Sequence, residues 1–290
     1  MTPLGISHFT VTSALGGGIA PTLQGLRDNR SGLSQDRFLD VDLPTWLGVV
    51  PGLDNVQLPA GMEAFDCRNN RLTLMGLETD GFGDRVREAV AQHGPHRVGV
   101  FLGTSTSGIL QTEVAYRHRD AATGALPASL HYAHTHNTYS VARYVRAALG
   151  LAGPAHVVST ACSSSAKVFA AAARQLALGS IDAAIVGGVD TLCLTTLYGF
   201  ASLQLTSSQP CRPYDAARDG ISIGEGAAFA LLERADLAAV IVGPMEPLQI
   251  DRMLVFLRGG YDALSLLVPR GSGAEVRFIA PASDFVTIEQ

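Results

Sequence analysis

Short apolar runs recur along the chain, and most are followed by a stretch with helical spacing. Residues 98–102 form a nearly continuous apolar run that ends at Gly103, as expected of a strand buried on both faces. Further candidate strands are 6–11, 156–159, 183–189 and 227–232. Strands that alternate with helices predict a largely parallel sheet covered by helices on both faces.

Two helices stand out between these strands. Residues 137–149 have one apolar stripe at helical spacing, and the stretch stops before Gly150. Residues 163–178 are apolar almost all round and stop before Gly179, so we expect this helix to be buried in the core. After residue 242 the alternation is no longer recognisable.

Composition and charge exclude several classes of protein. Hydrophobic residues make up 47% of the 290 residues, and 21 Lys and Arg face 26 Asp and Glu, a net charge of −5. This excludes a disordered chain and argues against a nucleic-acid binder. No apolar run reaches the roughly 18 residues that span a bilayer, and the first residues lack the pattern of a signal peptide. We therefore expect a cytoplasmic protein that binds neither nucleic acid nor membrane.

The chain divides into two parts. We expect residues 1–236 to form one domain and 237–290 to be an atypical tail, whose residues 237–242 could add one strand of a second half. Residues 267–272 (Leu-Val-Pro-Arg-Gly-Ser) match the thrombin recognition sequence of expression vectors. Two explanations stay open, a coincidence or vector-derived or frame-shifted sequence in the tail.

Cys162 is the candidate nucleophile. An apolar strand runs into a turn of small residues at 159–162, and a helix begins at once. The unpaired N–H groups at a helix N-terminus favour thiolate over thiol and could hold an oxyanion during acyl transfer. A free cysteine can also be a small core residue, but the strand–turn–helix placement favours the nucleophile. The other three cysteines have no chemical partners and are expected to be packing residues; the irregular spacing indicates neither a disulfide framework nor a zinc site.

Several motifs, in this order along the chain, resemble the β-ketoacyl-acyl-carrier-protein synthases, condensing enzymes of thiolase fold. The turn at 160–165 (Thr-Ala-Cys-Ser-Ser-Ser) resembles their active-site turn. The other matching segments are the Gly-rich loop 103–108, Gly187–Asp190, Arg212–Gly220 and Gly224–Ala228. The loop and the turn also resemble ketosynthases from aryl-polyene gene clusters, which is the weaker likeness.

The resemblance implies an α/β, thiolase-like fold with a mainly parallel sheet and helices on both faces. Cys162 would accept an acyl chain from a carrier-protein thioester, and a malonyl thioester would then lose carbon dioxide and attack it, in fatty-acid or polyketide biosynthesis. Thr106 would lie near the floor of the acyl pocket and Phe200 along its wall, although a loop hydroxyl and a core aromatic fit these two residues as well. No cofactor and no metal are implied.

The resemblance also implies partners and structural residues. Acyl carrier protein thioesters would be substrates, and the chain would form a homodimer or a ketosynthase-type heterodimer through the strand before Cys162. Asp215, Arg218 and Glu225 would tie the loop before the last strand through ion pairs.

One part of the family pattern is missing. The family's second half supplies two histidines that stabilise the enolate, whereas all eight histidines of this chain precede Cys162 and the 290 − 162 = 128 residues after it contain none. We therefore expect a complete N-terminal half, a truncated or atypical C-terminal half, and impaired condensation. The alternatives are a non-catalytic truncated or partner subunit that binds a ketosynthase or acyl carrier protein, and a Cys–His hydrolase that uses one of the histidines at 131–136. Metal binding by those three histidines is less favoured than surface or capping roles.

Overall fold

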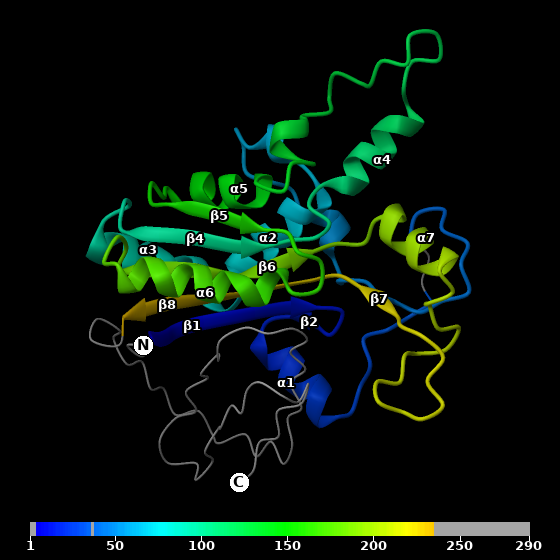
Figure 1. Cartoon of the computed structure of the whole chain (residues 1–290), viewed down its shortest axis with the longest axis horizontal. Coiled ribbons are helices and arrows are strands. Elements are labelled where there is room, and N and C mark those ends of the chain that lie inside the picture. Colours follow the sequence, from blue (N-terminus) through cyan, green and yellow to red (C-terminus); the bar gives the residue numbers. More distant parts are fainter. Residues whose placement is uncertain (1–3, 36–37, 235–290) are drawn as a thin grey trace. The chain divides into compact units, whose positions relative to one another are not determined.

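A six-stranded sheet forms the centre of the protein in the computed structural model, which describes residues 4–35 and 38–234 (Figure 1). The described residues belong to one unit of the chain, Met1–Ala239. The predicted tail, 237–290, lies outside the described residues. The strand order is β2-β1-β8-β6-β4-β5. The strands are β1 (Leu4–Ser13), β2 (Gly16–Gly17), β4 (Val98–Gly103), β5 (Ala155–Val158), β6 (Ala183–Asp190) and β8 (Gly226–Arg234).

The sheet is mixed, which corrects the expectation of a mainly parallel one. Strand β4 pairs in parallel with β5 and β6, as the helices between these strands predicted. Strand β8 runs antiparallel to β6, and β1 runs antiparallel to β8. An apolar run shows that a strand is buried but does not show its direction. Here the chain reaches β8 through α7 (Leu194–Ser202) and a long loop, which returns it in the opposite sense.

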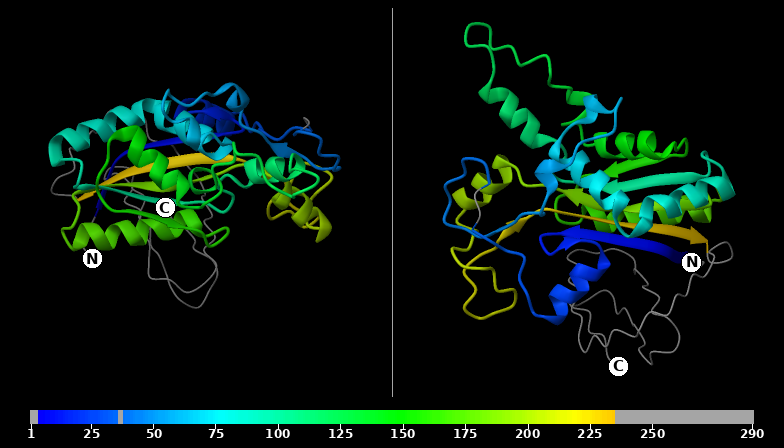
Figure 2. Two further views of the ribbon diagram at one scale, coloured as in Figure 1. Left: turned by 90° about the horizontal axis from the view of Figure 1, so that it is seen from above. Right: turned by 180° about the vertical axis from the view of Figure 1, so that it is seen from behind.

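Helices cover both faces of the sheet, as expected (Figure 2). On one face lie α2 (Arg68–Glu78), α3 (Phe82–His93) and α5 (Ser140–Leu149), and on the other lies α6 (Ser164–Ala177). The remaining elements are α1 (Ile19–Arg27), α4 (Ile109–Arg117), the small parallel pair β3 (Leu47–Gly48) with β7 (Ile223–Gly224), and the 3₁₀ turns Leu53–Asn55, Glu63–Phe65, Thr79–Gly81 and Tyr132–His134.

Strand β4 separates the two parts of the core. All six of its residues are buried. Val98, Val100 and Leu102 belong to the cluster on the side of α2, α3 and α5, while Phe101 belongs to the cluster under α6. Successive side chains of a strand point to opposite faces, so this one strand supplies both layers.

Helix α6 is buried along one face only, which corrects the expectation that it is enclosed on all sides. Ser164, Val168, Ala172 and Leu176 recur every fourth residue and form the buried stripe. Ala166 and Ala170 on the other side are exposed. The two faces of this apolar helix therefore have different surroundings. In the described part of the chain, no layer covers the face that carries Ala166 and Ala170.

Two glycines, one at the end of β4 and one near the end of β6, let the first turn of α6 approach the sheet. A Cβ at Gly103 would lie 2.4 Å from the backbone nitrogen of Ser165, and one at Gly188 would lie 2.7 Å from the Ser165 Cβ. Both distances are far inside van der Waals contact, so only glycine fits at this spacing. The register places Gly103 beside both Val158 and Gly188, so the ends of β4, β5 and β6 meet where α6 begins.

Candidate active site

Cys162 lies in the turn between β5 and α6. Helix α6 begins at Ser164 with Ser163 as its N-cap residue, so Cys162 is one residue outside the cap. The side chain is exposed, and Cys162 is the only exposed cysteine of the chain. The predicted strand, turn and helix are therefore confirmed around this residue, and Cys162 is exposed in the turn.

The residue before the cysteine has a strained backbone. Ala161 has φ = +53°, a left-handed conformation that is uncommon for a residue with a Cβ. Three donors hold its carbonyl oxygen: Ser164 Oγ at 2.6 Å, Ser164 N–H at 3.1 Å, and Ser105 Oγ at 3.1 Å. The third donor comes from the loop after β4, so the shape of the turn is fixed by a neighbouring strand end as well as by α6.

The hydroxyl groups around Cys162 hydrogen-bond within the turn. Ser164 Oγ accepts from the Thr160 N–H at 2.9 Å, and Ser163 Oγ donates to the Thr160 carbonyl at 3.1 Å. By contrast, the thiol of Cys162 has no hydrogen-bond partner among the described residues, and its backbone forms an isolated bridge with Thr160. An exposed thiol just before a helix N-terminus is the arrangement that attack on a carbonyl requires.

Two other cysteines are in surroundings that disfavour the thiolate. Burial raises the pKa of the Cys67 thiol to about 12, although its sulfur accepts the Asn70 N–H and caps α2. Burial likewise raises the pKa of Cys193. Cys211 is half-buried. These positions agree with the packing roles that the sequence predicted for them.

The loop after β4 is organised by Asp190, a residue to which the sequence reasoning gave no role. Asp190 Oδ1 accepts from the Ser105 N–H at 2.6 Å, the Thr106 N–H at 3.0 Å and the hydroxyls of Thr104 and Thr106 at 3.0 and 3.1 Å. The sequence contains a signal for this role. Parallel strands end at the same edge of a sheet, and an acidic residue at the end of the apolar run of β6 should therefore lie beside the loop after β4.

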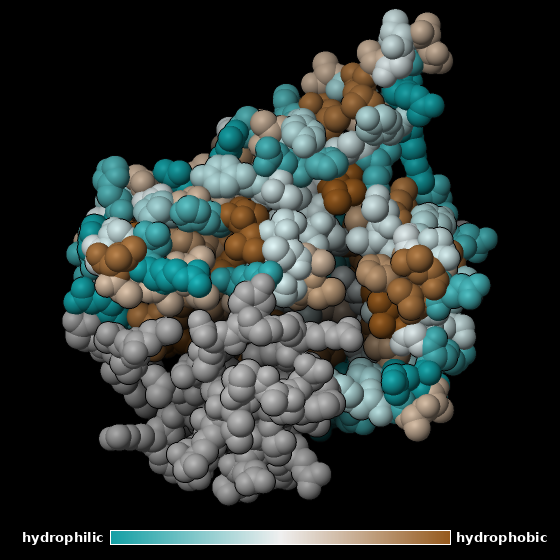
Figure 3. Space-filling model, viewed as in Figure 1, coloured by the Kyte–Doolittle hydropathy of each residue, from teal (hydrophilic) through white to brown (hydrophobic). Residues whose placement is uncertain are grey.

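Thr106 and Phe200 were the expected pocket residues. Thr106 is buried, and its hydroxyl donates to Asp190 and accepts the Thr191 N–H at 2.9 Å. Phe200 is half-buried on α7, where hydrophobic residues gather on the surface (Figure 3). No hydrogen bond, ion pair or ring contact within residues 4–35 and 38–234 joins either of them to Cys162. Their roles in an acyl pocket stay predictions.

A buried ion pair holds the segment before β8. Both carboxylate oxygens of Glu225 accept from Arg68, at 2.6 and 2.7 Å, and also from the N–H groups of Val50 and Leu192. Arg68 also pairs with Asp54. Thus the expected ion pair of Glu225 exists and its partner is on α2.

The expected ion pairs of Asp215 and Arg218 are not found among the described residues. Asp215 Oδ1 accepts the Ala217 N–H at 2.6 Å, and Arg218 donates to the backbone carbonyl of Asp215 at 3.0 Å. Hydrogen bonds from these side chains to the backbone of the turn therefore stabilise the loop in place of ion pairs.

The histidines at 131–136 interact with residues of α4 and of the 3₁₀ turn Glu63–Phe65. His136 Nδ1 lies 2.7 Å from Thr112 Oγ1, and the His134 ring packs edge-on against Phe65 with 4.7 Å between centroids. No described histidine hydrogen-bonds to Cys162. Within the described residues, no group of three His, Cys, Asp or Glu side chains could hold a metal ion.

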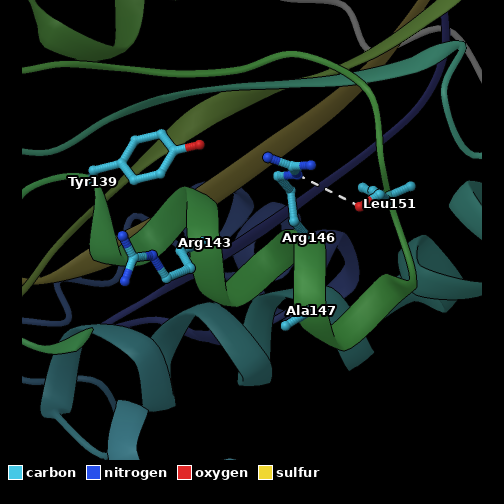
Figure 4. Close-up of a pocket in the computed structure, with 5 residues that line it drawn as sticks. All are labelled: Tyr139, Arg143, Arg146, Ala147 and Leu151. Atoms are coloured by element: carbon cyan, nitrogen blue, oxygen red, sulfur yellow. Dashed lines mark hydrogen bonds between the residues drawn. The ribbon is translucent and has the colours of Figure 1, made fainter. Parts of the chain in front are cut away.

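A surface pocket lies on α5 and does not include Cys162. It is lined by Tyr139, Arg143, Arg146, Ala147 and Leu151 (Figure 4). Arg146 Nε donates to the Leu151 carbonyl at 3.4 Å, and the Arg143 guanidinium lies 5.8 Å from the centre of the Tyr139 ring. The pocket is separate from the β5–α6 turn.

Within the described residues, no helix is both long and apolar enough to cross a membrane.

Comparison with known proteins places these features in a family context. The sequence model described as "Beta-ketoacyl synthase, N-terminal domain" matches residues 76–238, a span that contains β4, β5, α6 and β6. A 3-oxoacyl-[acyl-carrier-protein] synthase 2 from Rhizobium meliloti (strain 1021) is 42% identical over 96 residues, which are 30% of this chain and 23% of that protein. A nodulation protein E from Rhizobium leguminosarum bv. trifolii is 33% identical over 145 residues, which are 50% of this chain and 36% of that protein.

Solved structures give the same result. A ketosynthase (ApeO) in complex with its chain length factor (ApeC) from Xenorhabdus doucetiae matches with a TM-score of 0.68 and 31% identity. The match covers 80% of this chain and 58% of that chain. The chain therefore spans less than two thirds of the length of each of these three proteins.

Proposed function

The chain belongs to the β-ketoacyl synthase family and has its thiolase-like fold, and from this premise we propose that Cys162 accepts an acyl group from an acyl carrier protein thioester. The observation that carries the proposal is the placement of Cys162, an exposed thiol at the strand-to-helix turn directly before the N-cap of α6. The acyl chain length and the product class, including an aryl-polyene product, stay predictions.

The proposed step exchanges one thioester for another. The Cys162 sulfur attacks the thioester carbonyl, and negative charge develops on the carbonyl oxygen. The N–H of Cys162 supports this charge by donating a hydrogen bond. The bond between the carbonyl carbon and the carrier sulfur then breaks, and the proton of the Cys162 thiol ends on the carrier thiol. The new bond is an acyl thioester on Cys162.

Condensation with a malonyl thioester needs groups that this sequence does not supply after Cys162. The 128 residues that follow contain no histidine, and no described histidine bonds to the thiol. We therefore propose acyl transfer as the reaction of this chain, and we expect no detectable condensation from the chain alone. The same absence favours the second candidate, a non-catalytic partner subunit, in which Cys162 would not be acylated.

The edge of the sheet supports a dimer. Strand β5 is the last strand in the order, and within the described residues it pairs only with β4. A free strand edge has unpaired N–H and C=O groups that can pair with another chain. We propose that β5 forms the interface of a homodimer or of a ketosynthase-type heterodimer.

The test measures release of the free carrier thiol after an acyl carrier protein thioester is mixed with the full chain. We expect release of one carrier thiol per chain, and none from Cys162→Ala. Cys211→Ala is the matched control, because Cys211 is half-buried and outside the turn, and it should behave like the unsubstituted chain. Equal release from Cys162→Ala would refute Cys162 as the acceptor. No release from the unsubstituted chain would refute acyl transfer and leave the non-catalytic alternative.

A further inference from the structure

A single carboxylate oxygen of Asp190 binds the loop after β4. Asp190 is the last residue of β6, and its Oδ1 accepts four hydrogen bonds of 2.6 to 3.1 Å from three consecutive residues, 104–106. Two donors are backbone N–H groups and two are hydroxyls. Hydrogen bonds to an ionised carboxylate are stronger than those between neutral groups, so this contact fixes the backbone of the loop.

The same loop holds the β5–α6 turn at two points. The Thr104 N–H donates to the carbonyl of Val158, the last residue of β5, at 3.2 Å. Ser105 Oγ donates to the carbonyl of Ala161 at 3.1 Å. These two points bracket the turn, and Ala161 is the residue with the left-handed backbone directly before Cys162. A strained conformation persists only where its surroundings hold it, and Ser105 is the donor from outside the turn.

Asp190 is itself held in place. The N–H of Thr191 donates to Thr106 Oγ1 at 2.9 Å, and the N–H of Leu192 donates to the buried carboxylate of Glu225 at 3.2 Å. The backbone after Asp190 is therefore anchored on both the loop and the Arg68–Glu225 pair. Hydrogen bonds, joined by short stretches of backbone at 190–192 and 105–106, lead from this buried pair to the Ala161 carbonyl.

We propose that Asp190 is a positioning residue for Cys162, acting through Ser105 on the Ala161 carbonyl. It does not touch the thiol. It sets the backbone that directs the thiol and N–H of Cys162 toward the incoming carbonyl, as binding groups must be held within a fraction of an ångström for efficient reaction. The inference rests on the proposed function, because the position of Cys162 matters for catalysis only if Cys162 accepts an acyl group.

The test compares Asp190→Ala, Asp190→Asn and Ser105→Ala with Asp182→Ala in the full chain. Asp182 is the matched control: it directly precedes β6, whereas Asp190 ends it, and it makes a two-bonded ion pair with Arg97 away from the turn. Two quantities are measured for each variant. One is amide hydrogen exchange at Thr160 and Ser164, and the other is the maximal rate and half-saturating concentration of Cys162 acylation.

We expect Asp190→Ala to speed exchange at both amides by roughly fivefold to tenfold, the equivalent of one lost hydrogen bond. We expect its maximal acylation rate to fall by up to about 100-fold, with the half-saturating concentration unchanged. Asp190→Asn keeps one acceptor and should recover part of the rate. Asp182→Ala should change neither quantity by more than about twofold. Adding Ser105→Ala to Asp190→Ala should cause no further loss, because both act through one contact.

The outcomes separate this inference from the proposed function. Unchanged exchange at Thr160 and Ser164 in Asp190→Ala overturns the positioning role, whatever the acylation rate. Faster exchange in that variant, together with no acylation of the unsubstituted chain, overturns the proposed function and leaves the structural coupling established. If Asp190→Ala does not fold, Ser105→Ala decides: unchanged exchange and unchanged acylation in that variant overturn the positioning role.

Discussion

Replacing Gly103 by alanine should disrupt the contact that seats α6 on the sheet. The added Cβ would lie 2.4 Å from the Ser165 nitrogen and 2.5 Å from the Ser164 carbonyl carbon. Atoms in contact need about 3.5 Å, so the start of the helix must retreat by roughly 1 Å. The obstructing atoms are backbone, and no change of rotamer relieves them. The turn that carries Cys162 would move with the helix.

The magnitude follows from the cost of overpacking. Extra atoms in a well-packed site typically cost about 1–3 kcal/mol. Because a whole helix start must shift here, we expect the free energy of unfolding to fall by about 3 kcal/mol. With a urea slope of about 1–3 kcal/mol per molar for a protein of ordinary size, the midpoint of urea unfolding should fall by roughly 1–3 M.

Gly199 is the matched control. It lies within α7, and a Cβ there would meet nothing within 4 Å. Because alanine is the better helix former, Gly199→Ala should raise the free energy of unfolding by about 0.5–1 kcal/mol. Urea titration followed by circular dichroism measures both variants. A Gly103→Ala chain within about 0.5 kcal/mol of the unsubstituted chain would refute the close packing of α6 on β4.

Three further predictions follow from individual contacts. Glu225→Ala leaves the buried Arg68 without its main partner; the side chains of Glu225 and Arg68 are 0% and 8% exposed. Unfolding in urea should show that the free energy of unfolding falls by about 3–5 kcal/mol, and a fall below about 1 kcal/mol would contradict this prediction. A maleimide at pH 8 should label Cys162 first, ahead of the two buried cysteines with raised pKa, and peptide mapping that finds a buried one labelled first would show that the burial is wrong. The hydrogen bond from Arg97 lowers the pKa of Asp182, so this pair stabilises the fold above about pH 4, and its contribution is lost as the pH falls through the lowered pKa. Melting curves should therefore show that the stability lost in Asp182→Asn becomes smaller toward about pH 3. A loss of stability that does not change with pH would be inconsistent with the pair.

Local pattern predicted much of the fold. The apolar runs at 98–102 and 183–189 correspond to β4 and β6 to within a residue at each end, and the stretch 163–178 corresponds to α6. These elements are specified by their own residues, through the periodicity of burial. The direction of β8 was not predictable in this way, because it depends on the path of a long connection and not on the strand's own composition.

The site was predictable where it is local and not where it is assembled from distant segments. The turn at Cys162 follows from a strand, small residues and a helix start in one short stretch. The role of Asp190 depends on Ser105 and Thr106, 84 or more residues away, and that of Glu225 depends on Arg68 at a separation of 157. Such contacts exist only once the sheet order is known, so the sequence indicated a motif at each position without its partner.

Tandem mass spectrometry of the chain after reaction with an acyl carrier protein thioester tests most directly whether Cys162 is the acceptor. Fragment ions should place a single acyl group on Cys162, and neutral hydroxylamine should remove it, as it removes thioesters. An acyl group on one of the serines at 163–165, or one that resists hydroxylamine, would contradict the assignment of Cys162 as the nucleophile.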